Sequence, residues 1–134
     1  MPTRYKVLIT GSSGMLGIDL SRELAAGYDL AGLDVIRSPL SSVRKFYKGD
    51  ITDGKAVADI VAEAGPDIVV HAAAWTDVDG CELDPDKAYA VNSEGTRNVA
   101  LSCKKAGAVL IYISTDFVFD GKKRRAYRET RNRC

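Results

Sequence analysis

Three glycines, Gly11, Gly14 and Gly17, form the pattern G-x-x-G-x-x-G directly after a short apolar run. Gly11 permits a tight turn, Gly14 lets a pyrophosphate approach the backbone, and Gly17 lets the next helix pack close to the sheet. The amino end of that helix offers N–H groups and partial positive charge to phosphates. We therefore expect a dinucleotide site here that includes Met15 and Leu16. A glycine-rich turn without a ligand is the alternative interpretation.

Acidic and basic residues follow at the positions where such a site contacts adenosine. Asp34 lies twenty residues after Gly14. Its carboxylate can accept hydrogen bonds from both ribose hydroxyls and would repel a 2′-phosphate, which slightly favours NAD. Arg37 could instead hold the 2′-phosphate of NADP, so the cofactor is written NAD(P)H. Asp50 and Ile51 are placed to meet an adenine, unless Asp50 is only a turn residue.

Polar side chains also stand at the ends of two later apolar segments. The single histidine, His71, precedes three alanines and is expected to be structural. No Cys or carboxylate stands at ligand spacing from it, so we expect no metal site. Ser114 and Thr115 end the last segment, and a hydroxyl there can hydrogen-bond a substrate carbonyl oxygen that gains negative charge. Ordinary turn chemistry explains this Ser/Thr pair equally well.

The elements that must position these residues alternate between strand and helix patterns. Apolar runs predict five strands, at residues 5–10, 29–33, 43–48, 67–71 and 108–114. Helical spacing of apolar residues follows the first and third strands, and a long helix is expected from Pro85 to about Ala106. The stretch 71–83 between them is expected to be a loop. This alternation predicts an α/β fold with a Rossmann-type doubly wound parallel sheet, in the order 3-2-1-4-5.

Length and composition narrow the class of protein. The 134 residues suffice for one domain, and 46% hydrophobic with 28% charged residues excludes a disordered or fibrous chain. No apolar run approaches the roughly 20 residues of a membrane helix, and no signal peptide is visible. Three widely spaced cysteines, Cys81, Cys103 and Cys134, indicate free thiols. We expect a cytoplasmic protein that does not bind membranes.

Charge is distributed unevenly along the chain. Residues 1–119 hold 12 Lys and Arg against 16 Asp and Glu, whereas residues 120–134 hold seven basic residues against two acidic ones. A basic tail can bind nucleic acid, but no aromatic interleaving or nucleic-acid motif accompanies this one. We therefore expect no nucleic-acid partner, and interpret the tail as a solvated segment of a larger domain.

Several longer motifs resemble one family. The segments GSSGMLG, PDIVVHAAAWTDVDGCELDPDKAYAVNSEGTRNVA and ISTDFVFDG, together with Asp34, are similar to dTDP-4-dehydrorhamnose reductases of the extended short-chain dehydrogenase/reductase superfamily, over about residues 5–121. The resemblance implies reduction of a 4-keto nucleotide sugar by NAD(P)H, giving dTDP-L-rhamnose. It implies that Thr115 is the catalytic hydroxyl, that Asn92 supports the site from below, and that the cofactor crevice is lined by Ala72, Ala73 and Ala74.

The sequence departs from the family after this region. Family members continue into a Tyr-x-x-x-Lys helix and a substrate-binding region, but Tyr127 is followed at i+4 by Arg131. We therefore expect residues 1–121 to be an NAD(P)-binding Rossmann domain, and residues 122–134 to be a basic tail that begins a missing catalytic and substrate region. A chain truncated in this way is expected to be inactive alone and to self-associate through its uncovered fifth strand.

Two other functions remain open from the sequence. One is a non-catalytic NAD(P)-binding regulatory module, since relatives of this family serve as regulatory subunits, as in methionine adenosyltransferase. The other is a nucleotide-sugar epimerase relative, which would share Gly11–Gly17 but fits the ISTDFVFDG segment less well. A Tyr-x-x-x-Lys motif encoded further along the gene would separate the reductase from the regulatory module.

Overall fold

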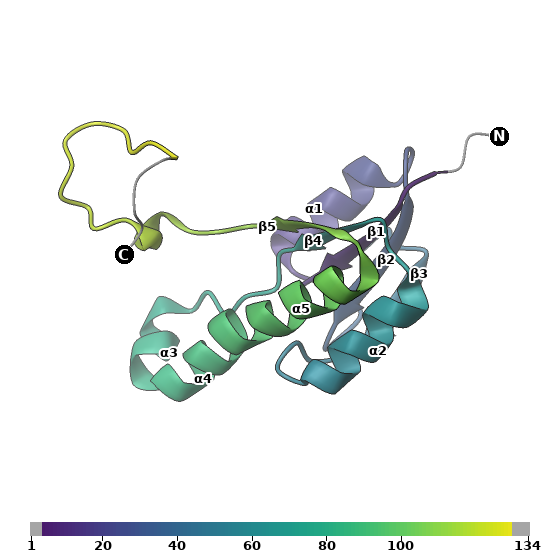
Figure 1. Cartoon of the computed structure of the whole chain (residues 1–134), viewed down its shortest axis with the longest axis horizontal. Coiled ribbons are helices and arrows are strands. Elements are labelled where there is room, and N and C mark those ends of the chain that lie inside the picture. Colours follow the sequence, from purple (N-terminus) through teal and green to yellow (C-terminus); the bar gives the residue numbers. More distant parts are fainter. Residues whose placement is uncertain (1–3, 130–134) are drawn as a thin grey trace.

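A parallel five-stranded sheet forms the centre of the fold (Figure 1). The computed structural model describes residues 4–129. The strand order is β3-β2-β1-β4-β5, and all four neighbouring pairs are parallel. The strands are β1 Lys6–Thr10, β2 Asp29–Asp34, β3 Lys45–Lys48, β4 Ile68–His71 and β5 Val109–Tyr112. The predicted fold and strand order are confirmed.

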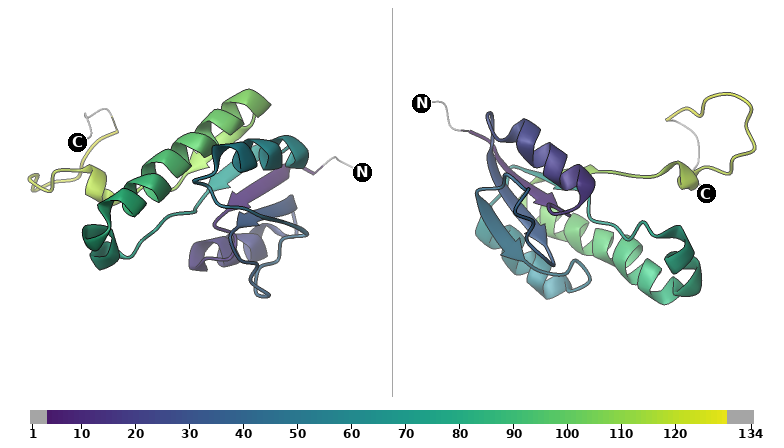
Figure 2. Two further views of the ribbon diagram at one scale, coloured as in Figure 1. Left: turned by 90° about the horizontal axis from the view of Figure 1, so that it is seen from below. Right: turned by 180° about the vertical axis from the view of Figure 1, so that it is seen from behind.

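Helices cover both faces of the sheet, with α1 on one face and α2 and α5 on the other (Figure 2). The helical segments are α1 Met15–Leu24, α2 Gly54–Ala64, α3 Val78–Leu83, α4 Pro85–Tyr89, a π-helical segment Ala90–Gly95, α5 Thr96–Ala106 and a 3₁₀ turn Asp116–Val118. This two-faced cover explains why the central strands are continuous apolar runs.

The core consists of two clusters, one on each face of the sheet. Side chains alternate between faces along β1, so Val7 and Ile9 pack towards Leu20 of α1. Leu8 lies in the opposite cluster together with Val61 of α2 and residues of α5. The sheet is therefore packed between two apolar clusters, which hold the ends of its strands in place relative to one another.

The ends of α2 and α5 follow sequence signals closely. Asp53 caps α2, where its carboxylate accepts a hydrogen bond from the Ala56 N–H at 3.0 Å. Gly65 and Gly107 end α2 and α5 in the left-handed conformation, with φ values of 54° and 70°. The position of Gly107 confirms the predicted end of the long helix at about Ala106.

Three expectations about the elements need correction. The stretch 71–83 is not all loop, because α3 forms at its end, where Asp77 accepts a hydrogen bond from the Gly80 N–H. This helix has six residues and no buried side chain, so it leaves no apolar stripe in the sequence. The helix expected from Pro85 is interrupted by the π-helical segment. The third and fifth strands are also shorter than predicted, at four residues each.

The chain leaves the sheet after β5, and its described continuation extends away from the domain (Figure 1). Residues 130–134 of the predicted basic tail, including Cys134, lie outside the described residues. No helix in residues 4–129 is long and apolar enough to span a membrane.

Candidate dinucleotide site

A cavity of about 540 Å³ opens at the carboxyl ends of β1, β2, β3 and β4. This edge is where open parallel sheets bind ligands. Nine of the residues predicted from the sequence line it: Gly11, Gly14, Asp34, Arg37, Asp50, Ile51, Ala72, Ala73 and Ala74. The structure thus brings together residues from four separate loops.

The glycine turn forms the base of the cavity. Gly11 has a φ of 69°, and a Cβ there would lie 2.7 Å from the Ala73 nitrogen, so only glycine fits. Gly14 is different, because a Cβ on it would meet only the Gly11 oxygen, at 3.4 Å. Within the described residues no side chain caps α1. Its first-turn N–H groups therefore remain available to an anion.

Gly17 serves a packing role that differs in detail from the prediction. A Cβ on Gly17 would lie 2.1 Å from the Gly11 oxygen and 2.7 Å from the Ser12 Cα. The close neighbour is therefore the backbone of the glycine turn rather than a strand. Gly17 allows the first turn of α1 to fold back tightly over the loop that precedes it.

Asp34 is oriented by backbone donors at the end of β2. Its Oδ2 accepts a hydrogen bond from the Ser13 N–H at 2.9 Å, and its Oδ1 accepts one from the Val35 N–H at 2.7 Å. A carboxylate oxygen accepts more than one hydrogen bond, so both can still receive a ligand hydroxyl. Arg37 lies on the same side, with its guanidinium 5.9 Å from the centre of the Phe46 ring.

Asp50 and Ile51 line the wall after β3. The Asp50 Oδ1 accepts hydrogen bonds from the Thr52 N–H at 2.9 Å and from the Thr52 hydroxyl at 2.8 Å. These are the bonds of a turn residue, which was the alternative interpretation of Asp50. Ile51 is buried and packs against Gly95. A Cβ added to Gly95 would lie 2.6 Å from the Ile51 Cδ1.

The opposite wall follows β4 and is held from behind by Asn92. The Asn92 side chain accepts a hydrogen bond from the Trp75 N–H at 2.8 Å and donates one to the Trp75 carbonyl at 3.0 Å. The Ala73 N–H also donates to the Thr10 hydroxyl at 3.3 Å. Asn92 itself is not among the lining residues, so its observed contacts fix the wall rather than face the cavity.

His71 is fully buried at the end of β4 and joins three elements by hydrogen bonds. Its Nδ1 lies 2.6 Å from the Thr10 hydroxyl, and its Nε2 lies 2.9 Å from the Thr96 hydroxyl. Thr96 donates its proton to the Asn92 carbonyl, so it must accept the Nε2–H of His71, and Thr10 must donate to Nδ1. Burial lowers the pKa of His71 to about 4, which keeps the ring neutral.

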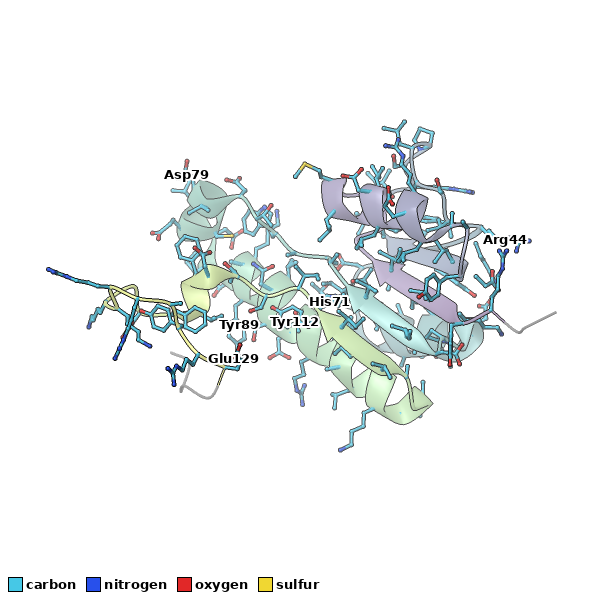
Figure 3. All side chains as sticks on the ribbon, turned by 90° about the horizontal axis from the view of Figure 1, so that it is seen from above. Arg44, His71, Asp79, Tyr89, Tyr112 and Glu129 are labelled. Carbon is cyan, nitrogen blue, oxygen red and sulfur yellow. The ribbon has the colours of Figure 1, made fainter. Side chains whose placement is uncertain are left out.

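The His71 ring also stacks on Tyr112 at the end of β5, with 5.4 Å between ring centres (Figure 3). This arrangement accords with the predicted structural role of His71. No group of three or more metal-ligating residues occurs in residues 4–129.

Comparison with known proteins identifies the family. The model of the family described as RmlD substrate binding domain matches residues 5–134. The chain belongs to the dTDP-4-dehydrorhamnose reductase family. The dTDP-4-dehydrorhamnose reductase of Streptomyces griseus is 47% identical over 128 residues, which cover 94% of this chain and 38% of that protein. The Bacillus subtilis spore coat polysaccharide biosynthesis protein SpsK is 42% identical, over 92% of this chain and 40% of its own length.

Solved structures agree with this assignment. A dTDP-4-dehydrorhamnose reductase of Bacillus anthracis in complex with NADP gives a TM-score of 0.83 at 36% identity, covering 99% of this chain and 44% of that chain. A Brucella ovis UDP-glucose 4-epimerase in complex with NAD gives a TM-score of 0.79 at 26% identity, and the match covers 87% of this chain and 37% of that chain. The chain spans about two fifths of the length of the two curated relatives, from Streptomyces griseus and Bacillus subtilis.

The remaining predicted site residues of this family member lie outside the cavity lining. Met15 is 85% exposed and Leu16 is 43% exposed on the first turn of α1. The Thr115 hydroxyl donates to the Asp116 carboxylate at 3.2 Å and accepts from the Phe117 N–H at 3.3 Å, so it caps the 3₁₀ turn. The catalytic role that the resemblance implies for Thr115 stays a prediction.

Sequence reasoning missed several contributors to the site. Ser13, Trp75 and Lys87 all line the cavity. The aromatic residue directly after three alanines, at the end of a predicted buried strand, was the available signal for Trp75. Lys87 carried no such signal, because its approach depends on how α4 is placed against the loop after β4.

Proposed function

We propose that this chain binds NAD(P)H and supplies the cofactor-binding part of an enzyme that reduces a 4-keto nucleotide sugar to a dTDP-L-rhamnose-type product. The observation that carries the proposal is the glycine turn, in which Gly11 has a φ of 69° and the following helix lacks a side-chain cap at the base of the cavity. Residues 1–121 would form the NAD(P)-binding domain, and residues 122–134 would begin the catalytic and substrate region.

The cavity is suited to a dinucleotide. Gly14 has ordinary backbone angles and an open side towards which a phosphate could approach, and the first-turn N–H groups of α1 would donate to it. Asp34 would accept hydrogen bonds from a ribose hydroxyl. Ile51 would contact the adenine face, and Ala72–Ala74 would leave room beside the backbone.

The bound cofactor would supply a hydride to the substrate carbonyl. This chain's own residues would bind and orient the two reactants. Thr115 would donate a hydrogen bond to the carbonyl oxygen, after giving up its present bond to Asp116.

Proton donation is the step for which the described residues offer no suitable group. The Tyr127 hydroxyl is hydrogen-bonded to Asp120, and this bond raises the pKa of Tyr127. Arg131 stands at i+4 instead of Lys. General acid catalysis contributes roughly 10²- to 10⁴-fold. We expect no turnover above background when the 134-residue chain is assayed with a dTDP-4-keto sugar and NADPH, and measurable turnover would contradict this expectation.

The comparisons bear on one of the two alternative functions, the epimerase. Sequence identities of 42–47% to curated relatives that include a dTDP-4-dehydrorhamnose reductase support the reductase over an epimerase, for which the Brucella ovis structure gives 26%. A non-catalytic NAD(P)-binding regulatory module would share the same cavity. A cytoplasmic location and a slight preference for NAD remain predictions from the sequence.

Fluorescence titration with NADH and NADPH tests the binding site. Gly14→Val should weaken binding at least tenfold, because its side chain would occupy the space that the phosphates need. We expect the fold to tolerate this change, since Gly14 has a φ of −77° and an added Cβ would have only one neighbour within 4 Å. Gly27→Val is the matched control, because nothing lies within 4 Å of a Cβ there. Equal binding by wild type and Gly14→Val would show that the site is assigned wrongly.

A further inference from the structure

A lysine that the sequence did not single out lines the cavity beside an aromatic ring. The Lys87 Nζ of α4 lies 4.1 Å from the centre of the Trp75 ring, and both residues belong to the cavity wall. The ion pairs of the described residues do not include Lys87, although acidic residues flank it in sequence. Its side chain is exposed. The charge is therefore positioned by an aromatic face and left available to an anion.

Trp75 is itself held firmly enough to act as a platform. Asn92 binds both its N–H and its carbonyl, at 2.8 and 3.0 Å. The Cys81 thiol donates to the same carbonyl at 3.5 Å. A Cβ on Gly80 would lie 2.8 Å from the Trp75 Cζ2, so the ring packs directly on the backbone of α3. Contacts from two helical segments thus fix the ring on which Lys87 rests.

The wall that carries Lys87 adjoins the glycine turn. Thr10 of β1 pairs with His71 of β4, so the two strands leave the sheet side by side. A Cβ on Gly11 would lie within 2.8 Å of the Ala73 backbone. The only other basic side chain of the cavity wall within the described residues, Arg37, comes from the opposite side, after β2.

These positions define two ends of the cavity. Asp34, Arg37 and Asp50 follow β2 and β3, where the adenosine half of a dinucleotide would lie. The rest of such a ligand would cross the glycine turn and continue towards the wall after β4. Its second phosphate, which carries the nicotinamide ribose, would then be the anion on the side of Lys87.

We propose that Lys87, positioned on the Trp75 ring, binds a phosphate of the ligand in this cavity. The inference rests on the proposed dinucleotide site and adds a specific cationic contact to it. The first candidate is the nicotinamide-side phosphate of the dinucleotide. The diphosphate of a nucleotide sugar offers the same chemistry, so the experiment must distinguish these two sources.

Equilibrium binding of NADH to the 134-residue chain tests the contact. Lys87→Met keeps the length of the side chain and removes its charge. We expect the Kd for NADH to rise about 3- to 10-fold, and the dependence of log Kd on log salt to become shallower, because one charged contact is lost. AMP lacks the second phosphate, so its Kd should stay unchanged. Lys105→Met, on an exposed position of α5 outside the cavity wall, is the matched control.

Trp75 provides a second variant with a smaller expected effect. Trp75→Leu should raise the Kd for NADH about 2- to 3-fold, because Lys87 loses the aromatic face that positions it. In Trp75→Leu, the further change Lys87→Met should then have less effect than in the wild type. Circular dichroism checks that each variant keeps its fold.

The outcomes separate the inference from the function on which it rests. If the wild type does not bind NADH, the proposed function is wrong. If the wild type binds NADH and Lys87→Met binds it equally, the dinucleotide contact is excluded. A weaker affinity of that variant for dTDP, measured at saturating NADH, would then assign Lys87 to the nucleotide sugar. Unchanged affinities for both ligands, or an equal loss for AMP, would overturn the inference.

Discussion

Asp34 is the residue on which cofactor preference is expected to depend. Its carboxylate is held by the backbone N–H groups of Ser13 and Val35, so it cannot turn away from a 2′-phosphate without losing both bonds. Asp34→Ala removes this repulsion while Arg37 remains, and the ratio of NADH to NADPH affinity should fall about 3- to 10-fold. Parallel titrations of both cofactors measure the ratio. An unchanged ratio would remove Asp34 from the cofactor site.

His71 makes the stability of the fold depend on pH. Its pKa is about 4 in the folded chain and 6.5 when unperturbed, so the unfolded state takes up the proton first as pH falls. The stability contributed by neutral His71 is complete above about pH 6.5 and is lost progressively towards pH 4. Protonation at Nδ1 would also set two donors against each other, because Thr10 already donates there.

Urea unfolding between pH 7 and 5 measures this effect directly. The free energy of unfolding should decrease by about 2 kcal/mol over this range. His71 is the only histidine, and most carboxyl groups titrate at lower pH, so the change can be assigned to it. A stability that stays flat from pH 7 to 5 would contradict the buried neutral histidine.

The strands and the helices that follow them were predictable from the sequence, whereas the irregular helical segments were not. Continuous apolar runs predicted the strands, and the helical spacing of apolar residues after the first and third strands predicted α1 and α2. The π-helical segment Ala90–Gly95 was not predictable, because its residues have no distinctive spacing. The contacts of this segment depend on the tertiary structure. The Asn92 side chain accepts a hydrogen bond from the Trp75 N–H, and the Asn92 carbonyl accepts one from the Thr96 hydroxyl.

The candidate site was predicted more completely on the side of β1 to β3 than beyond β4. Glycine spacing and Asp34 reflect local backbone demands that a sequence displays directly. Trp75 and Lys87 meet through the packing of α3 and α4, two short segments without buried residues. Their contact depends on tertiary structure, which periodicity does not encode.

A buried polar atom in the turn between β1 and α1 is expected to lower the stability of the fold. The Ser12 Oγ is buried without a hydrogen-bond partner among the described residues, and it packs against Gly32 of β2. Ser12→Ala should therefore raise the free energy of unfolding by about 1 kcal/mol. Ser13→Ala is the neighbouring control, and it should lower stability because the Ser13 hydroxyl accepts a bond from the Ser38 N–H. If urea unfolding gives Ser12→Ala a lower free energy of unfolding than the wild type, the Ser12 hydroxyl has a hydrogen-bond partner in the folded chain.

Within residues 4–129, no strand pairs with the outer edge of β5, where the sheet ends. Val109, Ile111 and Tyr112 of β5 are each about half exposed or more, at 61%, 48% and 48%. The described continuation of the chain runs away from this edge (Figure 2). An open strand with apolar side chains favours pairing with another chain.

We therefore predict that the 134-residue chain self-associates. Light scattering across a dilution series should show a molecular mass that increases with concentration. Ile111→Lys places a charge on the exposed edge and should shift the chain towards monomer. Lys55→Met, at an exposed position of α2, is a control that should leave association unchanged. A wild-type monomer at the highest concentration would rule out the prediction.

Binding of a nicotinamide dinucleotide at the carboxyl edge of the sheet can be tested directly. Amide chemical-shift mapping during a titration with NADH tests both binding and location. We expect saturable shifts concentrated at residues 11–17, at Asp34 and at residues 72–75, with little change at the amino ends of the strands. An absence of saturable shifts, or shifts centred away from the glycine turn, would contradict it.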